Sequence, residues 1–506
     1  MKKLLKTLLL ALMCVIFGVS TIACGGGGNP PPEDDITSFD AQTQAIIDGI
    51  NYNADGTYQG NLSIRVVNVQ SEKDTINQFV NAFKQQYPNI TVTVNSNALM
   101  DNYYDNLPKA FANGQLQDIF WLAQDHVDTL CYKQKNFGKP ASGGDDVYLP
   151  EMFVPLSALD EKDNSIDFTT DLAAGALSVS EFRGQMFMLP RDYNQVVMYY
   201  DKDWFDIAGV QYPSATTPMT GEQFKQMLIN LRNGLRNSNQ QMASGVTYAS
   251  YFSADNPVAD VNMLWDSFAW PLIKSFGGQV IDSNGEVKFN SDQTFNAINY
   301  MNGLKKLNLV NTTGQPDTDF KQQKTAVMFH SRAVLTNILA QLDGASWGPI
   351  DNLAVAPVPN FGGTYSVGAG SSGYAISRNA QDKTAAWLFL KFVVGQIGQQ
   401  AFGATGNGVP VRNDLLTGAG AATAMWKNPY GLTGLASDFN HDVFIANMNA
   451  ATTTRDYFQY APISAQSDIQ LAIETAFNYI TQSSDETKIR EQIAKSAASI
   501  IAAINM

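Results

Sequence analysis

The sequence predicts an α/β fold, and three observations support this class. Short apolar segments typical of buried strands alternate with segments whose apolar residues recur at helical spacing. The order strand, helix, strand, helix, strand between residues 62 and 122 predicts an open, mostly parallel sheet flanked by helices. A second stretch of the same kind, from about 198 to 368, predicts another sheet. The chain is long enough for two units of ordinary size.

The first unit is defined by five expected elements. They are a strand at 62–69, a helix with its buried face at 76, 79, 80 and 83, a strand at 90–94, a helix containing 103, 107 and 111, and a strand at 118–122. Ser71 and Asp74 form a capping-box pattern ahead of the first helix. Ligands of such sheets bind beyond the carboxyl ends of the strands. Those ends are Gln70 with Ser71, and residues 123–126.

The second unit and the C-terminal part are read in the same way. We expect strands at 196–200, 245–249 and 374–377, a further apolar segment at 353–357, helices at 221–235 and 382–394, and two or three helices over 463–506.

The N-terminal segment predicts export. Lys2, Lys3 and Lys6 precede an uncharged apolar run over residues 7–23, which is the pattern of a cleaved signal peptide at 1–23. A permanent membrane helix is the alternative. It would need roughly 20 apolar residues, and this run is slightly shorter and is followed at once by four glycines.

The sequence Thr21-Ile22-Ala23-Cys24 resembles a bacterial lipobox, although Thr21 stands where leucine is usual. We therefore expect Cys24 to be the acylated first residue, and ordinary cleavage with a stray thiol is the alternative. Residues 24–60 begin with Gly, Pro and acidic residues, and we expect them to be a flexible linker. Only Cys131 then remains, so no intrachain disulfide can form.

Composition excludes several classes of function. The net charge is −14, and removal of the three signal lysines leaves 30 basic against 47 acidic residues. This balance argues against nucleic-acid binding and against attachment to anionic lipid through basic patches. The three histidines have no metal-ligand spacing, and neither H-E-x-x-H nor C-x-x-C occurs. We expect no cofactor and no metal.

Seven short landmarks recur in one order along the chain. They are 117–121 (QDIFW), 189–194 (LPRDYN), 198–202 (MYYDK), 270–273 (WPLI), 325–329 (TAVMF), 355–359 (VAPVP) and 386–392 (AWLFLKF). With them the chain resembles the bacterial extracellular solute-binding proteins of family 1, which are maltose-binding-protein-like. The resemblance covers about residues 61–412, and the C-terminal helices more weakly.

The resemblance implies a two-lobed periplasmic-binding-protein fold that closes on its ligand by hinge bending. It places 61–195 with 374–408 in one lobe and 196–373 with 409–506 in the other. It places the crossings between lobes near 194–197, 368–373 and 407–411, and an ordinary turn is the alternative for the third. It also implies a monomer that captures a sugar and delivers it to the permease of an ABC importer.

A sugar site needs aromatic rings for stacking and planar polar groups for paired hydrogen bonds. The resemblance assigns Asp125 to hydroxyl binding, whereas a helix N-cap is the alternative. Trp121 is one place from the family's ring, so it is either a stacking platform or a core residue. Trp265 and Phe268 would share one helix face, where Phe268 matches a ligand-facing ring and core packing is the alternative.

The remaining site candidates are polar or small. Tyr193 and Asn194 lie on the first crossing, and Gln70 and Ser71 lie in the first strand-to-helix loop. Gly370 and Ser371 belong to the second crossing. Ser331 and Arg332 follow a strand where relatives place cleft residues. Arg332 either binds ligand or pairs with surface acids.

One ring of the family is missing. The corresponding position is Gln470, and Tyr457 and Tyr460 are possible substitutes. The ligand should therefore not be called maltose.

Other functions remain as alternatives. Gly368-x-Gly370-x-x-Gly373 matches a dinucleotide fingerprint, but it leads into a strand where such a site requires a helix. An exported glycoside hydrolase would need two carboxylates across a cleft. A structural surface lipoprotein would show repeats or long β tracts. A binding protein for a polyamine or an amino acid derivative is a further alternative. We expect no enzyme.

Overall fold

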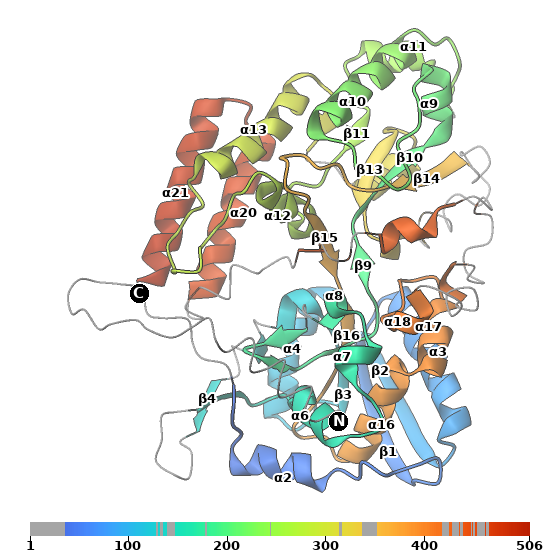
Figure 1. The fold of residues 1–506 in the computed structure, drawn as a ribbon, viewed down its shortest axis with the longest axis vertical. Helices are drawn as coiled ribbons and strands as arrows, with labels where there is room; N and C mark the ends of the chain where they lie inside the picture. Colours follow the sequence, from blue (N-terminus) through green and yellow to red (C-terminus); the bar gives the residue numbers. More distant parts are fainter. Residues whose placement is uncertain are drawn as a thin grey trace.

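The computed structural model describes residues 36–127, 130–131, 135–138, 147–177, 180–242, 244–312, 316–335, 338, 352–416, 425–427, 435, 439–446, 448, 451–452, 461 and 465–505. These residues form two α/β lobes, each built around a five-stranded sheet, with narrow connecting strands between them (Figure 1). The two-lobed fold class is as predicted. Within the described residues, no helix is both long and apolar enough to cross a membrane.

The sheet of lobe 1 has the order β2-β1-β3-β16-β8. Its strands are β1 (Gly60–Val67), β2 (Ile90–Ala98), β3 (Ile119–Ala123), β8 (Leu189–Pro190) and β16 (Ser372–Ile376). β1 is parallel to β2 and β3, whereas β16 is antiparallel to β3 and β8. The sheet is therefore mixed rather than mostly parallel, because β16 enters from the other lobe and runs against its neighbours.

The helices of lobe 1 beside this sheet are α3 (Gln70–Gln86), α4 (Met100–Ala112) and α16 (Lys383–Val394), and α17 (Gln396–Gly403) packs on α3 and α16. The predicted buried face of α3 is confirmed, since Ile76, Phe79, Val80 and Phe83 are all at most 7% exposed. The predicted capping box is wrong. The N–H groups of residues 72 and 73 already bond to the Val69 carbonyl, so the helix begins before Ser71 can cap it.

The expected linker ends earlier than residue 60. Helix α2 (Ala41–Gly49) is capped by Asp40, and Asp40 also pairs with Arg378 at 2.8 Å. Ile36, Ile47 and Ile50 are at most 5% exposed in the core of lobe 1. These three isoleucines provide the apolar burial that the Gly and Pro residues before them lack, so residues 36–60 belong to the lobe.

The sheet of lobe 2 has the order β12-β11-β13-β10-β14. Its strands are β10 (Val197–Asp201), β11 (Ala259–Asp260), β12 (Val310–Asn311), β13 (Val327–His330) and β14 (Leu353–Ala356). β11 is parallel to β12 and β13, and β10 is antiparallel to β13 and β14. This sheet is also mixed.

The helices of lobe 2 are α9 (Lys202–Ala208), α10 (Gly221–Arg236), α11 (Tyr248–Ser253), α12 (Asp266–Ser275), α13 (Asp292–Lys306), α20 (Gln466–Gln482) and α21 (Glu486–Ile504). The C-terminal pair lies beside α13, as Figure 1 shows. The strand expected at 245–249 is wrong. Thr247 caps α11, and Tyr248 and Phe252 then pack edge-on against Trp204, a spacing that only a helix provides.

Shorter elements complete the described chain: η1 (Gln124–His126), β4 (Lys135–Gly138), β5 (Val147–Pro150), α6 (Leu156–Lys162), α7 (Phe168–Asp171), α8 (Ala174–Leu177), β6 (Glu181–Phe182), β7 (Gln185–Met186), α14 (Pro316–Lys321), η2 (Arg332–Val334), α18 (Asn413–Leu416), η4 (Met425–Lys427) and η5 (His441–Phe444).

Three short strands connect the lobes in the order β17-β15-β9. They are β9 (Asn194–Gln195), β15 (Val367–Gly370) and β17 (Ala451–Thr452). The first two lie at expected crossings. The third expected crossing, at 407–411, is wrong, because Val409 pairs with Tyr193 and the chain continues into α18, which packs on α7 and α17 of lobe 1. A two-residue strand such as β17 has no sequence signature.

Candidate binding cleft

A cleft of about 490 Å³ lies between the lobes, where β9 and β15 connect them. Both lobes and the connecting strands contribute to its walls. Its lining residues are Ser71, Glu72, Trp121, Ala123, Gln124, Arg191, Asp192, Asn194, Val196, Leu264, Trp265, Asp266, Ser267, Ser331, Ala333, Gly370, Ser371, Ser372, Asn407, Gln470 and Glu474.

Seven of the predicted ligand-binding residues meet in this cleft. They are Ser71, Trp121, Asn194, Trp265, Ser331, Gly370 and Ser371. They come from segments up to 300 residues apart in the chain, so only the fold brings them together. Gln470, the residue at the family's missing ring position, also lines the cleft.

Four predicted residues do not line the cleft. Gln70 starts α3 and donates to Asp74 at 2.8 Å. Tyr193 is fully buried, with its hydroxyl 3.3 Å from Gln195. Phe268 is 3% exposed and packs on Phe329 in the core of lobe 2. The aromatic residue of that helix that reaches the cleft is therefore Trp265.

Arg332, the fourth, is fully buried away from the cleft. Its guanidinium lies 5.3 Å from the ring centroids of both Trp426 and Phe444. It also donates to the Trp426 carbonyl and lies 2.9 Å from His441 Nδ1. Burial lowers the pKa of Arg332 to about 10. This geometry ties the residue after β13 to Trp426, His441 and Phe444, which is neither of the two roles predicted.

The side chains of four further candidates lie outside the described part. Asp125 belongs to η1, but its side chain is not described. Tyr457, Tyr460 and Cys24 lie outside the described residues.

The floor of the cleft is an ion network centred on Arg191, which is 2% exposed. Its guanidinium donates to Glu72 at 2.5 Å, to the Ser372 hydroxyl at 3.1 Å and to the Tyr374 hydroxyl at 3.2 Å. Asp192 accepts from the Ser372 backbone at 2.7 Å and from its hydroxyl at 2.8 Å. The network joins α3, the segment after β8, and β16.

Burial sets the electrostatics of this network. Desolvation alone would lower the pKa of Arg191, but the neighbouring Glu72 charge reverses this and the pKa is raised. Desolvation raises the pKa of Glu72, against the opposing effect of Arg191. Arg191 therefore stays charged at every physiological pH, with its donors directed to protein partners.

Three residues of the cleft wall carry buried polar atoms without a hydrogen-bond partner. These atoms are Glu72 Oε2, Trp121 Nε1 and Asn194 Oδ1. A buried donor or acceptor left unpaired costs roughly 1–3 kcal/mol. Because all three residues line the cleft, small side-chain shifts would let a hydroxyl-bearing ligand pair with these two acceptors and one donor.

Charge in the cleft is mainly negative. Glu72, Asp192, Asp266 and Glu474 line it, and among the described lining residues Arg191 is the one cation. Gln470 donates to Glu474 at 2.7 Å on α20. No group of three or more potential metal ligands occurs among the residues that the structure describes.

Sequence reasoning missed Glu72, Gln124, Arg191, Asp192 and Glu474 as site residues. Arg191 and Asp192 stood within one landmark, directly before Tyr193 and Asn194, and this position was the available signal. Gln124 holds the second connecting strand, since its side-chain oxygen accepts from the Ser371 N–H at 2.7 Å. Glu474 had no signal, because an acid on an amphipathic helix is usually solvated.

Comparison with known families gives a match over most of the two lobes. A family profile described as bacterial extracellular solute-binding protein matches residues 69–400. A search of curated protein sequences gave no match.

Solved structures share the fold at low sequence identity. UgpB from Mycobacterium tuberculosis, solved with glycerophosphocholine, has a TM-score of 0.64 and 16% identity over 88% of this chain and 99% of its own. The GacH receptor of Streptomyces glaucescens, solved with acarbose, has a TM-score of 0.62 and 15% identity over 88% and 99%. The Listeria monocytogenes protein Lmo0181, solved with cycloalternan, has a TM-score of 0.60 and 15% identity over 88% and 99%.

Proposed function

This chain belongs to the bacterial extracellular solute-binding proteins, and we propose that its ligand is a neutral sugar, held between the lobes and passed to the permease of an ABC importer. The family's extracellular role means that the protein works outside the cytoplasm. The sugar proposal rests on the composition of the cleft wall. It contains Trp121 and Trp265 together with Glu72 and Asn194, and each of the latter two has an unpaired polar atom.

Each part of this wall suits a sugar. Trp121 comes from β3 of lobe 1 and Trp265 from the start of α12 in lobe 2, so closure brings a ring from each side. Rings bind the apolar faces of a pyranose. Carboxylate and amide oxygens accept from its hydroxyls. A hydrogen bond to a carboxylate contributes about 1.5–3 kcal/mol, and one to a neutral amide about 1 kcal/mol.

The charge balance favours a neutral ligand over an anionic one. An anion in the cleft would face four carboxylates, and Arg191 is already bonded to Glu72, Ser372 and Tyr374. Several solved neighbours were crystallised with neutral sugars, among them the tagatose-bound protein of Thermotoga lettingae. A polyamine also suits carboxylates beside tryptophans, and it is therefore the rival ligand.

Two of the cleft carboxylates already bond to other protein groups, which supports ligand binding rather than catalysis. Asp192 is held by the backbone and hydroxyl of Ser372, and Glu72 by Arg191. A glycosidase needs one carboxyl group free as an acid and another free as a nucleophile or base. The raised pKa of Glu72 is also a property of such acids, so turnover must be measured directly.

The test is calorimetry on the chain from residue 24 onward, with Cys24→Ser for solubility. The panel contains neutral mono- and oligosaccharides, uronic acids, putrescine, spermidine and amino acids. We expect micromolar binding, about −8 kcal/mol, of at least one neutral sugar, and no product by chromatography. Binding of only polyamines or amino acids contradicts the sugar proposal, and sugar turnover contradicts the non-enzymatic role.

We further propose attachment to the outer face of the cell membrane through lipid on Cys24 alone, as a monomer. The support is the lipobox pattern with the Gly- and Pro-rich segment after it. In cells, wild-type protein should fractionate with membranes and Cys24→Ser with the soluble exported fraction. A Cys14→Ser control should behave as wild type. Equal release of wild type and Cys24→Ser argues for ordinary cleavage.

A further inference from the structure

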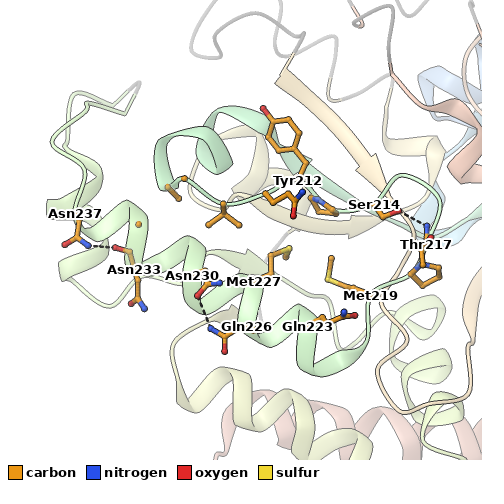
Figure 2. A pocket seen from close by; sticks show the side chains of 17 residues that line it. Tyr212, Ser214, Thr217, Met219, Gln223, Gln226, Met227, Asn230, Asn233 and Asn237 are labelled. Carbon is orange, nitrogen blue, oxygen red and sulfur yellow. Dashed lines mark hydrogen bonds between the residues drawn. The ribbon is translucent and has the colours of Figure 1, made fainter.

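A second hollow lies on lobe 2, away from the interlobe cleft, and at about 700 Å³ it is the larger of the two. It is formed by one continuous part of the chain. One wall is the segment 208–219 that joins α9 to α10, and the other is a face of α10 (Figure 2). We call this hollow the α10 groove, and its lining residues fall within 208–237.

The α10 wall is a row of side-chain amides. Gln223, Gln226, Asn230, Asn233 and Asn237 follow one another at spacings of three and four residues, which places them on one helix face. Figure 2 shows this row along the helix. At 1.5 Å per residue it extends about 21 Å.

The charged side chains of α10 itself lie outside the groove. Lys225 pairs with Glu222 at 3.7 Å, and Arg232 and Arg236 both bond to Asp255. None of the 17 lining residues is charged, although 16% of the chain's residues are. The groove is therefore an uncharged strip on an otherwise acidic protein.

The facing wall carries an aromatic ring in a fixed position. Tyr212 is 42% exposed, and its hydroxyl donates to Asp206 at 2.7 Å. Its ring lies 6.1 Å from that of Tyr200. The segment around it is held by the Ser214 hydroxyl, which accepts from the N–H groups of Thr216 and Thr217. The ring is thus ordered before any ligand arrives, which reduces the entropy cost of binding.

These features select a chemical class. An amide offers both a donor and an acceptor, so a row of amides can pair with successive hydroxyls. The Tyr212 ring, with Met219 and Met227 between the walls, supplies apolar surface for sugar faces. An anionic polymer would meet no cation among the lining residues.

We propose that the α10 groove is a second binding surface, specific for neutral glycan chains and separate from the interlobe cleft. The groove is open and elongated, so it holds part of a long chain at the protein surface, whereas the cleft encloses a small ligand. The proposal goes beyond the transport function and does not require it.

The test is native gel electrophoresis through soluble polysaccharides: starch, galactomannan and hydroxyethyl cellulose, with carboxymethyl cellulose as the anionic match. All proteins in the test carry Trp121→Ala, which should weaken sugar binding in the interlobe cleft. We expect at least one neutral polymer to retard this background variant, and Tyr212→Ala with Asn230→Ala in that background to weaken binding roughly fivefold to tenfold. Mobilities are taken relative to gels without polymer, and a melting scan confirms that each variant is folded.

A matched control is Lys225→Gln, which lies on the same helix outside the groove and should be retarded like the background. The proposal is overturned if no neutral polymer retards the protein, if the groove variant is retarded equally, or if carboxymethyl cellulose binds more tightly than hydroxyethyl cellulose. A third outcome separates the two proposals. If small sugars give no heat in calorimetry but a polymer still retards the protein in a way that depends on Tyr212, the cleft proposal is rejected and the groove proposal stands.

Discussion

The Arg191 guanidinium and the Glu72 carboxylate form a 2.5 Å ion pair at the floor of the cleft, with side chains 2% and 13% exposed. Glu72 belongs to the first turn of α3, and Arg191 precedes the first connecting strand. The pair therefore joins the sheet-covering helix to the segment from which the lobes diverge. It also leaves one Glu72 oxygen unpaired at the cleft wall.

The first prediction concerns this pair. Arg191→Met leaves Glu72 buried without its countercharge, and breaking a buried pair from one side costs about 3–5 kcal/mol. We expect the free energy of unfolding, measured in urea, to fall by that amount. We also expect the affinity for sugar to be at least tenfold weaker. Arg490→Met is the control. It breaks an exposed pair with Asp292, where the side chains are 50% and 78% exposed, and should cost under about 1 kcal/mol. Equal losses for both variants would contradict the structural role of the network.

The second prediction separates ligand contact from core packing at Trp121. Trp121→Phe keeps a ring and removes the unpaired Nε1–H, so we expect sugar affinity to fall about fivefold to tenfold with little loss of stability. Trp204→Phe is a matched control, because Trp204 is also buried with an unpaired Nε1 but lies in the core of lobe 2. Its calorimetric affinity should stay at the wild-type value. An unchanged affinity for Trp121→Phe would remove Trp121 from the site.

The third prediction tests the second connecting strand. A Cβ on Gly368 would lie 1.8 Å from the Ser267 carbonyl oxygen, so β15 approaches α12 too closely for any side chain. Overpacking of this kind costs about 1–3 kcal/mol, and Gly368→Ala should lose that much in urea unfolding. It should also weaken sugar binding, because Ser267 lines the cleft.

Gly303 in α13 is the control for this substitution, since a Cβ there would meet no atom within 4 Å. Gly303→Ala should stabilise the protein by about 0.5–1 kcal/mol, as expected for glycine to alanine inside a helix. If Gly368→Ala leaves the free energy of unfolding unchanged, β15 and α12 can move apart without a loss of stability.

The fourth prediction concerns pH. Asp260 is fully buried, and desolvation, with Asp319 adding to it, raises its pKa to about 8. The folded state therefore keeps a proton that the unfolded chain releases near pH 4, so the free energy of unfolding falls as pH rises from about 4 through 8. One such proton contributes a slope of up to about 1.4 kcal/mol per pH unit.

Asp260→Asn replaces the protonated acid by a neutral group of the same shape and should flatten this slope in urea titrations between pH 5 and 8. Asp201, whose burial raises its pKa to about 7, contributes in the same direction and should leave a residual slope. Asp292→Asn, where the side chain is 78% exposed, should keep the wild-type slope. A slope that survives Asp260→Asn unchanged would exclude Asp260 as its source.

The sequence predicted correctly those elements that are specified by residues close together in the chain. The buried face of α3 and helix α16, which begins after its predicted start at Asp382, follow from apolar spacing and a capping side chain. The expected strand at 245–249 failed because Thr247 capping and packing on Trp204 outweigh the local strand propensity. Two-residue strands such as β9 and β17 depend on neighbours distant in sequence.

The sequence by itself determined the α/β class and most strands and helices, because these depend on periodicity and on neighbours within a few residues. It also indicated which segments reach the cleft. Only the tertiary structure decided which side chain of each segment lines it: Trp265 rather than Phe268, and Ser331 rather than Arg332. The physical reason is that burial and partners come from packing between segments far apart in the chain, which local periodicity does not encode.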